Sequence, residues 1–490
     1  MKILIVSHTY WPHLNGQAVF VTNLAEGLVE RGHQVTVLLP SVARPRLEIR
    51  NGVLLETTPS IDLRFIHKDL SISYAPVAKI KAIFDRLQPD LVHLQDPAPV
   101  SQLVRQIARK RGIAVLATHH PGPAIWAPYL PGENLLVQKI VVPVIWSSFL
   151  SYLNKVDQVT VPSRASARML IKKGLHKPVR PISCGVKLEK FDNFPDKTGN
   201  DIDRPSLPVG TMRFLYVGRL DEEKRVDVLI RAMGKVKNQN IQLLLAGDGS
   251  KEKMIYRLVD DLNLGERVKY LGRIERSQVA NILRDADVFV MPGDGESLSI
   301  ATLEAMACGL PVIAANSMAL PELVQTGKNG LLFQPGDEDD LARKMDEMAA
   351  MSGRWKQMGI ISKEMVQNHQ LSSTIDGYEK LYSQMQRHQP QVVRKEVPLN
   401  APRPVSAFMF NSNIIFFIVQ FAVIITILLL TLFSQNSPVI AAPGNKIDLI
   451  SDDMLAGLQK LFTIIKQIDL SNNQINNGMS FVSLIKQGFG

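Results

Sequence analysis

The chain has 490 residues, of which 46% are hydrophobic and 21% charged, so it is long enough for two or three folding units and is not a disordered polypeptide. Its formal net charge of +10 predicts a surface that attracts anions, such as nucleic acid, acidic lipid headgroups or a phosphorylated substrate. Its two cysteines, Cys184 and Cys308, lie far apart and not at metal-ligand spacing, which argues against a disulfide framework and a zinc site.

Short apolar runs alternate with helical patterns through residues 1–191. This alternation predicts an α/β unit with a parallel sheet flanked by helices. Residues 1–7 lack a complete signal-peptide core and are interpreted as the first buried strand. The candidate strands are 2–7, 35–39, 91–94, 114–118 and 158–161.

Residues 192–210, rich in Pro, Asp and Gly, are predicted to be a linker, after which the same alternation returns over residues 211–365. Two similar sheets in tandem predict a cleft between them, at the strand ends where open α/β sheets usually bind ligands. Residues 366–388 are expected to form a C-terminal helix that packs back on the first unit. The candidate strands of the second unit are 213–217, 241–246, 268–272, 287–291 and 311–315.

The C-terminal region is predicted to contain a membrane anchor. Residues 389–412 form a basic, Pro-punctuated linker, and residues 413–433 are uncharged over about 20 residues, the length of a transmembrane helix. Basic residues precede this span and mainly acidic ones follow it. The positive-inside rule therefore predicts a single-pass protein of the cell membrane, with the folded units cytoplasmic and residues 434–490 outside. That tail includes a candidate amphipathic helix at 451–470.

The segment 293–315 carries the strongest chemical signal. A strand ends at Pro292, a glycine-containing loop follows, and a helix is predicted to begin near Ser297, so its free backbone amides favour phosphate. Glu296 lies in the loop and Glu304 on the helix, where carboxylates can accept hydrogen bonds from sugar and ribose hydroxyls. Taken alone, two such acids are more often solvated surface charges than ligand-binding groups.

This stretch resembles the E-x7-E signature of family 4 retaining glycosyltransferases, and the order of motifs is similar over nearly all of residues 1–385. The resemblance implies an α/β fold of the GT-B type, in which two Rossmann-like domains face a cleft. It implies further that the second domain binds a nucleotide-sugar donor and the first binds the acceptor. Other segments that resemble the family are 217–233, 246–250 and 320–337.

The resemblance also implies roles for single residues. Arg219 and Lys224 are cations of the kind that stabilise charge on a leaving nucleoside diphosphate. Leu298 and Ser299 stand where many relatives carry an aromatic residue and a glycine, which leaves the donor sugar open. Asn15 stands where the family commonly has a glycine, so donor contact is expected at Gly16 and is left open at Asn15. The implied catalytic residues are His120, Arg219, Lys224 and Glu296. The implied donor-binding residues are Gly16, Gly218, Arg219, Lys224, Gly247, Ser297, Leu298, Ser299 and Glu304.

His120, at the end of a candidate strand, matches a family histidine that binds the donor sugar, although a lone histidine there is more often structural. We expect it to position the sugar and stabilise charge, because in this family the leaving phosphate is thought to assist removal of the acceptor proton. Neither an enzyme nucleophile nor a metal cofactor is expected. Three Asp pairs are interpreted as a linker, a strand boundary and a helix cap: Asp201/Asp203, Asp285/Asp287 and Asp337/Asp339.

The acceptor is sought on the first unit. The basic segments 102–112 and 163–174 are compatible with anionic lipid or with a solvated face. Residues 133–153 are apolar and fit either a core helix or a hydrophobic acceptor groove. Residues 116–130 are similar to bacterial diacylglycerol glycosyltransferases.

The favoured function is transfer of a hexose, with retention, from a UDP- or GDP-sugar to a membrane lipid or envelope glycan. Two alternatives stay open: a soluble or polysaccharide acceptor, or a catalytically silent, nucleotide-sugar-binding membrane scaffold. The complete set of implied catalytic residues argues against silence. Nucleic-acid binding is disfavoured, because the basic residues accompany no stacking aromatics or reader motif.

Overall fold

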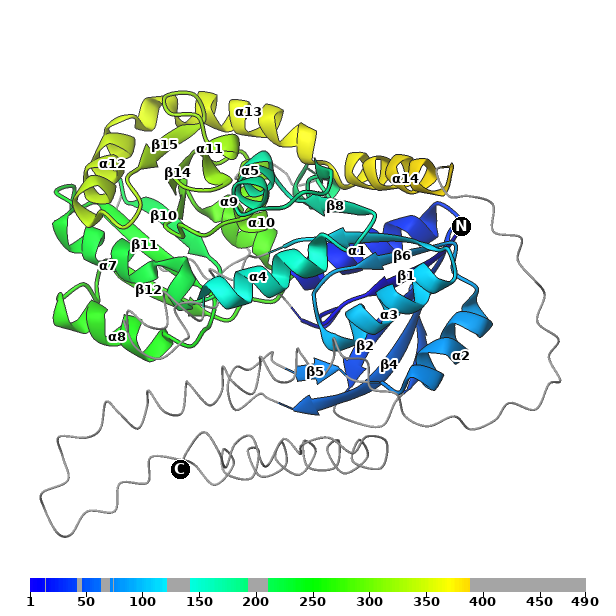
Figure 1. The fold of residues 1–490 in the computed structure, drawn as a ribbon. Coiled ribbons are helices and arrows are strands. Elements are labelled where there is room, and N and C mark those ends of the chain that lie inside the picture. Colours follow the sequence, from blue (N-terminus) through cyan, green and yellow to red (C-terminus); the bar gives the residue numbers. More distant parts are fainter. Residues whose placement is uncertain are drawn as a thin grey trace, which may run out of the picture.

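The computed structural model of the chain describes residues 1–13, 15–41, 46–62, 71–73, 75–120, 142–192 and 210–387. These residues form two α/β units, drawn in blue to cyan and in green to yellow in Figure 1, with α14 extending beyond the second unit to cover the first. The predicted fold class of two Rossmann-like units is confirmed. All ten candidate strands are present as well.

The first unit contains a sheet of order β3-β4-β2-β1-β6-β7-β8-β9, with β5 paired to β4. Its central strands are apolar runs buried on both faces, as expected for parallel strands covered by helices. The strands are β1 Lys2–Val6, β2 Gln34–Ser41, β3 Leu47–Arg50, β4 Val53–Asp62, β5 Ser71–Ser73, β6 Leu91–Leu94, β7 Ala114–Thr118, β8 Gln158–Val161 and β9 Val179–Pro181. The helices are α1 Gly16–Glu30, α2 Val77–Leu87, α3 Pro99–Lys110, α4 Val142–Leu153, α5 Arg164–Lys172 and α6 Glu189–Asp192.

The second unit contains a parallel sheet of order β12-β11-β10-β13-β14-β15, which is a doubly wound arrangement. The strands are β10 Met212–Val217, β11 Ile241–Ala246, β12 Val268–Gly272, β13 Val288–Met291, β14 Val312–Ala315 and β15 Gly330–Phe333. The α-helices are α7 Val226–Lys235, α8 Glu252–Asp261, α9 Val279–Asp285, α10 Ile300–Ala307, α11 Leu320–Leu323, α12 Glu338–Ala350, α13 Trp355–Val366 and α14 Leu371–Arg387. The short 3-10 helices are η4 Glu222–Lys224, η5 Ser352–Arg354 and η6 Gln367–His369.

In both sheets the strand order reverses beside the first strand, between β1 and β6 and between β10 and β13. Such switch points leave a crevice at the carboxyl ends of the strands, because the following helices cross to opposite faces. The loops after these four strands are therefore where a ligand site is expected.

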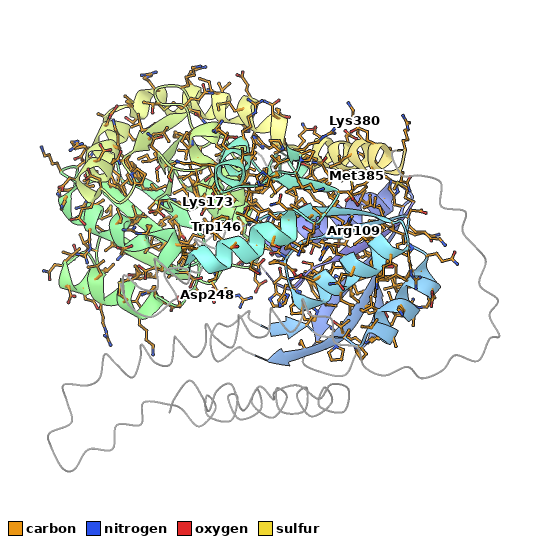
Figure 2. The ribbon with its side chains drawn as sticks, in the orientation of Figure 1. Arg109, Trp146, Lys173, Asp248, Lys380 and Met385 are labelled. Carbon is orange, nitrogen blue, oxygen red and sulfur yellow. The ribbon has the colours of Figure 1, made fainter. Side chains whose placement is uncertain are left out.

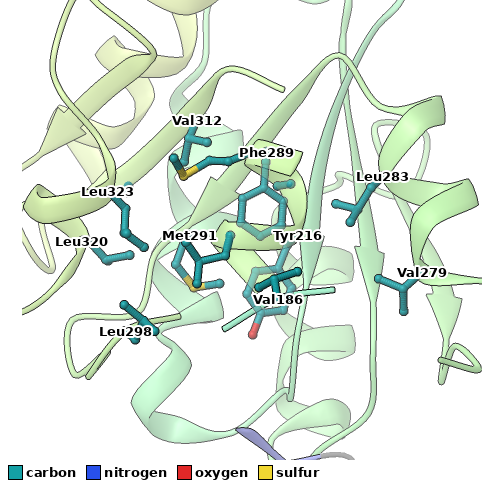
Figure 3. Close-up of a cluster of buried hydrophobic side chains, with 14 of the residues drawn as sticks. Val186, Tyr216, Val279, Leu283, Phe289, Met291, Leu298, Val312, Leu320 and Leu323 are labelled. Carbon is teal, nitrogen blue, oxygen red and sulfur yellow. The ribbon is translucent and has the colours of Figure 1, made fainter. Parts of the chain in front are cut away.

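The core beside the second switch point is closely packed. Figure 3 shows Tyr216 of β10, Phe289 and Met291 of β13 and Leu298 in one buried cluster. Tyr216 is fully buried, and its hydroxyl donates to the carbonyl oxygen of Arg219 at 2.6 Å. This bond ties the core directly to the loop that carries the predicted donor-binding cations.

The helix α14 returns to the first unit and packs against α1. Tyr378 and Tyr382 of α14 are fully buried, and Arg31 at the end of α1 forms ion pairs with Asp376 and Glu379. The Tyr382 hydroxyl also hydrogen-bonds Nδ1 of His93 on β6 at 2.8 Å. The last helix of the described chain thus packs against the first unit.

The predicted basic linker 389–412, membrane span 413–433 and tail 434–490 lie outside the described residues. Within the ranges that are described, no helix has both the length and the apolar character needed to cross a bilayer.

Candidate functional site

Two glycine-containing loops of the second unit pack against each other after β10 and β11. Gly218 donates its N–H to the Ala246 carbonyl at 3.0 Å, and a Cβ on Gly247 would lie 1.9 Å from the carbonyl oxygen of Gly218. Gly247 also has a φ of +138°, which residues with side chains rarely adopt. Leu220 then donates its N–H to the carbonyl of Asp248, labelled in Figure 2, at 2.8 Å. Backbone packing therefore accounts for Gly247 and sets the position of the loop after β10, whereas a Cβ on Gly218 would lie 2.7 Å from the Tyr216 hydroxyl.

That loop carries the two predicted cations. Arg219 forms ion pairs with Asp221 and Glu223. Lys224 Nζ lies 2.6 Å from Oε1 of Glu296, so it bridges the loops that follow β10 and β13. The Arg219 and Lys224 side chains are 30% and 21% exposed, so solvent reaches both. Three of the four implied catalytic residues therefore belong to one charged group on the second unit.

The helix α10 begins later than the predicted start near Ser297. Ser299 has a φ of +72°, a left-handed conformation that cannot continue a right-handed helix, so the first helical residue is Ile300. Ser299 Oγ lies 2.8 Å from Oγ1 of Thr302, which ties it to the first turn. Leu298 is 4% exposed and belongs to the buried cluster of Figure 3. Of Leu298, only the main chain is therefore left for a donor to contact.

Glu304 lies on α10 and is 2% exposed. It forms an ion pair with Arg276, from the loop after β12, and Lys190 of the first unit also acts on its charge. Burial raises the pKa of Glu304, whereas the attraction of Arg276 lowers it. The two glutamates of the motif thus have separate cation partners, Lys224 for Glu296 and Arg276 for Glu304.

On the first unit, the loop after β1 leads into α1. Asn15 Oδ1 accepts the N–H of Ala18 at 2.9 Å, so this departure from the family pattern is the N-cap of α1. A Cβ on Gly16 would lie 3.8 Å from Cδ1 of Ile300, an ordinary contact. The N-terminal ends of α1 and α10 therefore meet at the junction of the two units, and Gly16 lies at that meeting point.

His120 follows β7 and is 7% exposed. Its Nε2 lies 2.8 Å from Oε1 of Gln95, the residue after β6, and its ring centroid is 5.0 Å from that of Phe20 on α1. Burial lowers the pKa of His120 to about 3, so the imidazole is neutral at physiological pH. Donation from Nε2 to Gln95 leaves Nδ1 as the acceptor. The stabilisation expected of His120 is therefore that of a neutral dipole rather than of a cation.

Two more histidines are buried beside it. His93 hydrogen-bonds Tyr382 and, at 2.6 Å, Thr118 Oγ1, whereas His119 packs edge-on against Phe149 of α4 with centroids 4.7 Å apart. Burial lowers the pKa of each ring to about 3. Neither ring nitrogen of His119 has a hydrogen-bond partner in the described part of the chain.

The helix α4 is the described part of the apolar segment 133–153. Trp146 and Tyr152 are buried in the core of the first unit, which favours the core-helix interpretation for this part. Lys173 lies over the Trp146 ring, 5.3 Å from its centroid (Figure 2).

The basic segment 102–112 has two different sides. Arg105 of α3 is only 3% exposed, and burial lowers its pKa. The prediction that Arg105 lies on a solvated or lipid-facing surface is therefore wrong. Arg109 (Figure 2) is exposed, and its Nη1 donates to the carbonyl of Lys155 at 3.3 Å.

Hydrogen bonds join the two units at this junction. Ser297 Oγ donates to the carbonyl oxygen of His120 at 2.8 Å, and Ser166 Oγ donates to the carbonyl of Ser297 at 3.3 Å. Glu322 of α11 accepts the N–H of Ala165, at the start of α5, at 2.6 Å. The loop that contains Glu296 and Ser297 is thereby held against the strand end that carries His120.

The structure thus brings Gly16, His120 and Ser297 to one junction and links Lys224 to it through Glu296. Arg219, Gly218 and Gly247 lie in the loops that follow β10 and β11, and the Leu298 side chain is buried in the core. Sequence reasoning missed Gln95, Arg276 and Glu322. Gln95 had a usable signal, because a polar residue directly follows an apolar strand there. Arg276 and Glu322 had none, since each is one charge among several in a polar loop or short helix.

Asp337 caps α12 by accepting the N–H groups of Asp339 and Asp340, as its interpretation predicted. In the described ranges, no three His, Cys, Asp or Glu side chains gather so that they could hold a metal ion. Asp201 and Asp203 lie outside those ranges.

Comparison with known proteins places this geometry in a family. The model "Glycosyltransferase Family 4" matches residues 14–190, and "Glycosyl transferases group 1" matches residues 199–365. An alpha-monoglucosyldiacylglycerol synthase of Streptococcus pneumoniae is 26% identical over 347 residues, which cover 70% of this chain and 77% of the relative.

A GDP-mannose-dependent monoacylated alpha-(1-6)-phosphatidylinositol monomannoside mannosyltransferase of Corynebacterium glutamicum is 30% identical over 280 residues, 55% of this chain and 70% of the relative. The solved sucrose-phosphate synthase of Thermosynechococcus elongatus matches in fold, with a TM-score of 0.63, 23% identity and coverage of 78% and 98% of the two chains. The chain therefore belongs to the family 4 glycosyltransferases of GT-B fold and is a hexosyltransferase.

Proposed function

We propose that this enzyme transfers a hexose, with retention of configuration, from a UDP- or GDP-sugar to a lipid acceptor at the cytoplasmic face of the cell membrane. The observation that carries the proposal is the contact between Lys224 and Glu296 at the place where Ser297 meets His120. Lys224 and the loop before α10 lie on one side of the junction between the two units, and the neutral imidazole of His120 lies on the other.

The charges suit a leaving nucleoside diphosphate. Arg219 and Lys224 are both neutralised by carboxylates, and a diphosphate would compete for them with a higher charge density. The free amides at the start of α10 add donors for the same phosphates. Negative charge that grows on the bridging oxygen is thus met by preorganised groups, and we propose that these cations make a metal unnecessary.

The first unit supplies polar groups without charge. His120 is neutral, so it presents an acceptor nitrogen to a sugar hydroxyl. We place the acceptor hydroxyl on the face of the sugar from which the diphosphate leaves. As the bond between the sugar and the diphosphate breaks and the new glycosidic bond forms, an oxygen of the leaving diphosphate takes the proton of the acceptor hydroxyl. This arrangement retains the configuration and uses no enzyme nucleophile.

Two observations support a lipid acceptor. The names of the two relatives above refer to a glucosyldiacylglycerol and a phosphatidylinositol mannoside, both lipids. The sequence adds an uncharged stretch, 413–433, after a basic linker, which would keep the cleft close to the cytoplasmic leaflet. An envelope glycan is the other acceptor class that such an anchor serves.

The test is a transfer assay on the full chain in detergent with EDTA. UDP- and GDP-hexoses are screened against diacylglycerol, a phosphoinositide, polyprenyl-linked sugars and a soluble glycan, and NMR gives the anomeric configuration of the product. Lys224→Met is the informative variant. Lys235→Met is its control, because Lys235 pairs with Glu338 and Asp339 on the surface of the second unit.

We expect an α-linked glycolipid from an α-linked donor, a loss of about 100-fold or more in Lys224→Met, and little change in Lys235→Met. An inverted product, or equal activity of the two variants, contradicts the proposal. Strict preference for the soluble glycan contradicts the lipid part alone. Donor binding without hydrolysis or transfer would identify a silent scaffold instead.

A further inference from the structure

We propose that Gln95 is a substrate-binding residue that also positions His120: its amide oxygen holds the imidazole, and its amide nitrogen donates a hydrogen bond to a hydroxyl of the transferred sugar or the acceptor. The inference rests on the proposed transfer reaction and extends it to a residue outside the family motifs that the sequence shows.

Gln95 lies at the first switch point, directly after β6. Its backbone N–H donates to the carbonyl of Val6 at 2.9 Å, which places it level with the end of β1. Its side-chain Oε1 lies 2.8 Å from Nε2 of His120 on the neighbouring strand end. Because the His120 carbonyl accepts from Ser297, Gln95 is two residue contacts away from the donor-side loop.

The structural tasks at this loop belong to its neighbour. Asp96 accepts the N–H of His8 at 2.7 Å, the N–H of Ala98 at 3.0 Å and the hydroxyl of Ser101 at 3.1 Å. Asp96 therefore secures both the loop after β1 and the start of α3. Gln95 is not needed for either task, so its burial calls for another explanation.

The amide nitrogen of Gln95 provides that explanation. Gln95 is 2% exposed, and within the described residues its Nε2 has no hydrogen-bond partner. Gln158, another buried glutamine of the same sheet, differs: its Nε2 donates to the carbonyls of Val159 at 2.9 Å and Pro178 at 2.7 Å. A buried donor without a partner is unfavourable, and at a ligand crevice its natural partner is a ligand oxygen.

A hydroxyl group fits both halves of the pair. His120 Nδ1 can accept the hydroxyl proton of one sugar hydroxyl, while Gln95 Nε2 donates to the oxygen of the same or an adjacent one. The titratable groups that act on the pair are His119, directly after β7, and His93 on β6, both neutral for the reason given above. Recognition here thus depends on hydrogen bonds and not on charge.

The experiment uses three variants of the full chain in detergent. Gln95→Met removes both hydrogen bonds with little change in volume. Gln95→Glu keeps an acceptor for His120, removes the donor and adds a charge that favours protonated His120. Gln158→Met is the matched control, because it removes a buried amide whose nitrogen is already hydrogen-bonded, at the amino end of β8 and so at the opposite end of the strands from Gln95. Thermal unfolding is recorded for each variant.

We expect Gln95→Met to lower kcat/KM by about 10- to 100-fold, and Gln95→Glu to move the acid limb of the pH profile up by about one unit or more. Gln158→Met should lower the unfolding temperature and leave both kinetic quantities unchanged. Donor hydrolysis without acceptor distinguishes the two sources of the hydroxyl: a matching loss assigns it to the sugar, and an unchanged rate assigns it to the acceptor. Wild-type kinetics in Gln95→Met, with an unmoved profile in Gln95→Glu, overturn the proposal.

A second measurement does not depend on turnover. NMR of the 15N-histidine-labelled chain, with the His120 signal assigned from His120→Gln, reports the protonated ring nitrogen. We expect a neutral ring protonated at Nε2 in the wild type and a changed nitrogen shift in Gln95→Met. If the wild type transfers no sugar but the His120 nitrogen shift still changes in Gln95→Met, the proposed transfer reaction is wrong and the positioning role of Gln95 stands. If the spectrum of Gln95→Met is unchanged, Gln95 does not position His120.

Discussion

The two sides of the proposed site differ in charge, and we call them the charged wall, on the second unit, and the neutral wall, on the first unit. On the second unit, Arg219 and Lys224 are charged, part-exposed and paired with carboxylates. On the first unit, His120 is buried and neutral, and its partner is an amide. A cation that is already paired can exchange its carboxylate for a phosphate and never stays unpaired in a part-buried site. An uncharged opposite wall has no cations that would compete for the diphosphate.

The difference also separates the kinds of change that each wall tolerates. The charged wall depends on loops whose backbones touch, as the 1.9 Å approach of a Cβ on Gly247 to Gly218 indicates. The neutral wall depends on burial of its side chains beneath α1, α4 and α14. Substitutions of charged residues in the charged wall should therefore lower catalytic activity, and low pH should lower the stability of the neutral wall.

The largest effect is expected from removing a cation of the charged wall. Arg219→Met should lower kcat/KM by about 100- to 1000-fold, because a preorganised donor to the leaving diphosphate is lost. Arg219→Lys should recover part of this loss, since it keeps the charge but not the planar fork. Arg231→Met is the control, because Arg231 lies 3.9 Å from Glu338 on the outer surface. Steady-state kinetics and inhibition by UDP or GDP measure the effect, and equal values for Arg219→Met and Arg231→Met would exclude this role.

The next effect tests the backbone that supports those cations. Gly247→Ala should destabilise the second unit by about 2–4 kcal/mol, because the new Cβ meets a carbonyl oxygen at a φ that alanine rarely adopts. Gly265→Ala is the control, since no atom lies within 4 Å of its added Cβ. Denaturant unfolding of both variants checks the difference. A Gly247→Ala variant as stable as Gly265→Ala would mean that the two loops do not pack as described.

Acid should act on the neutral wall. His93, His119 and His120 each have a folded pKa lowered by burial from 6.5 to about 3, so between these values the unfolded chain binds protons that the folded chain does not. Stability should be unaffected by these groups above about pH 7 and should fall as the pH drops from 6.5 towards 3, by up to about 1.4 kcal/mol per pH unit for each histidine.

His119→Phe separates this effect from general acid denaturation. It removes one titrating ring whose nitrogens make no hydrogen bonds to the described residues, so it should flatten the acid limb of the stability curve at little expense above pH 7. His176→Phe is the control, because His176 is exposed. Equal acid limbs in the wild type and His119→Phe would show that the ring is already charged in the folded protein.

The share of the fold and of the site that the sequence predicts differs between the two walls. The ten predicted strands were found because they contain short apolar runs, and nine of them lie inside a sheet while β12 lies at an edge. The edge strand β3, where Ile49 is 73% exposed, carries no such signal. The charged wall was predictable residue by residue, since Arg219, Lys224, Glu296 and Glu304 lie in local motifs. The pairing of Gln95 with His120 was not, because it joins residues 25 positions apart through strand order alone. The burial of Leu298 and Arg105 likewise depends on packing that local sequence does not encode.

The smallest effect is expected at the link between the walls. Ser297→Ala removes the hydrogen bond from Oγ to the His120 carbonyl but keeps the backbone contact from Ser166, so the units should still close. A loss of about 0.5–1.5 kcal/mol, or about 2- to 13-fold, is expected in kcat/KM. Most of it should appear in the KM for the donor, because the loop that contains Glu296 is then less firmly held against His120. Ser317→Ala is the matched control, since Ser317 Oγ donates to the carbonyl of Asp294 within the second unit. If Ser317→Ala raised the donor KM as much as Ser297→Ala, rigidity of the second unit, and not its contact with the first, would set donor affinity.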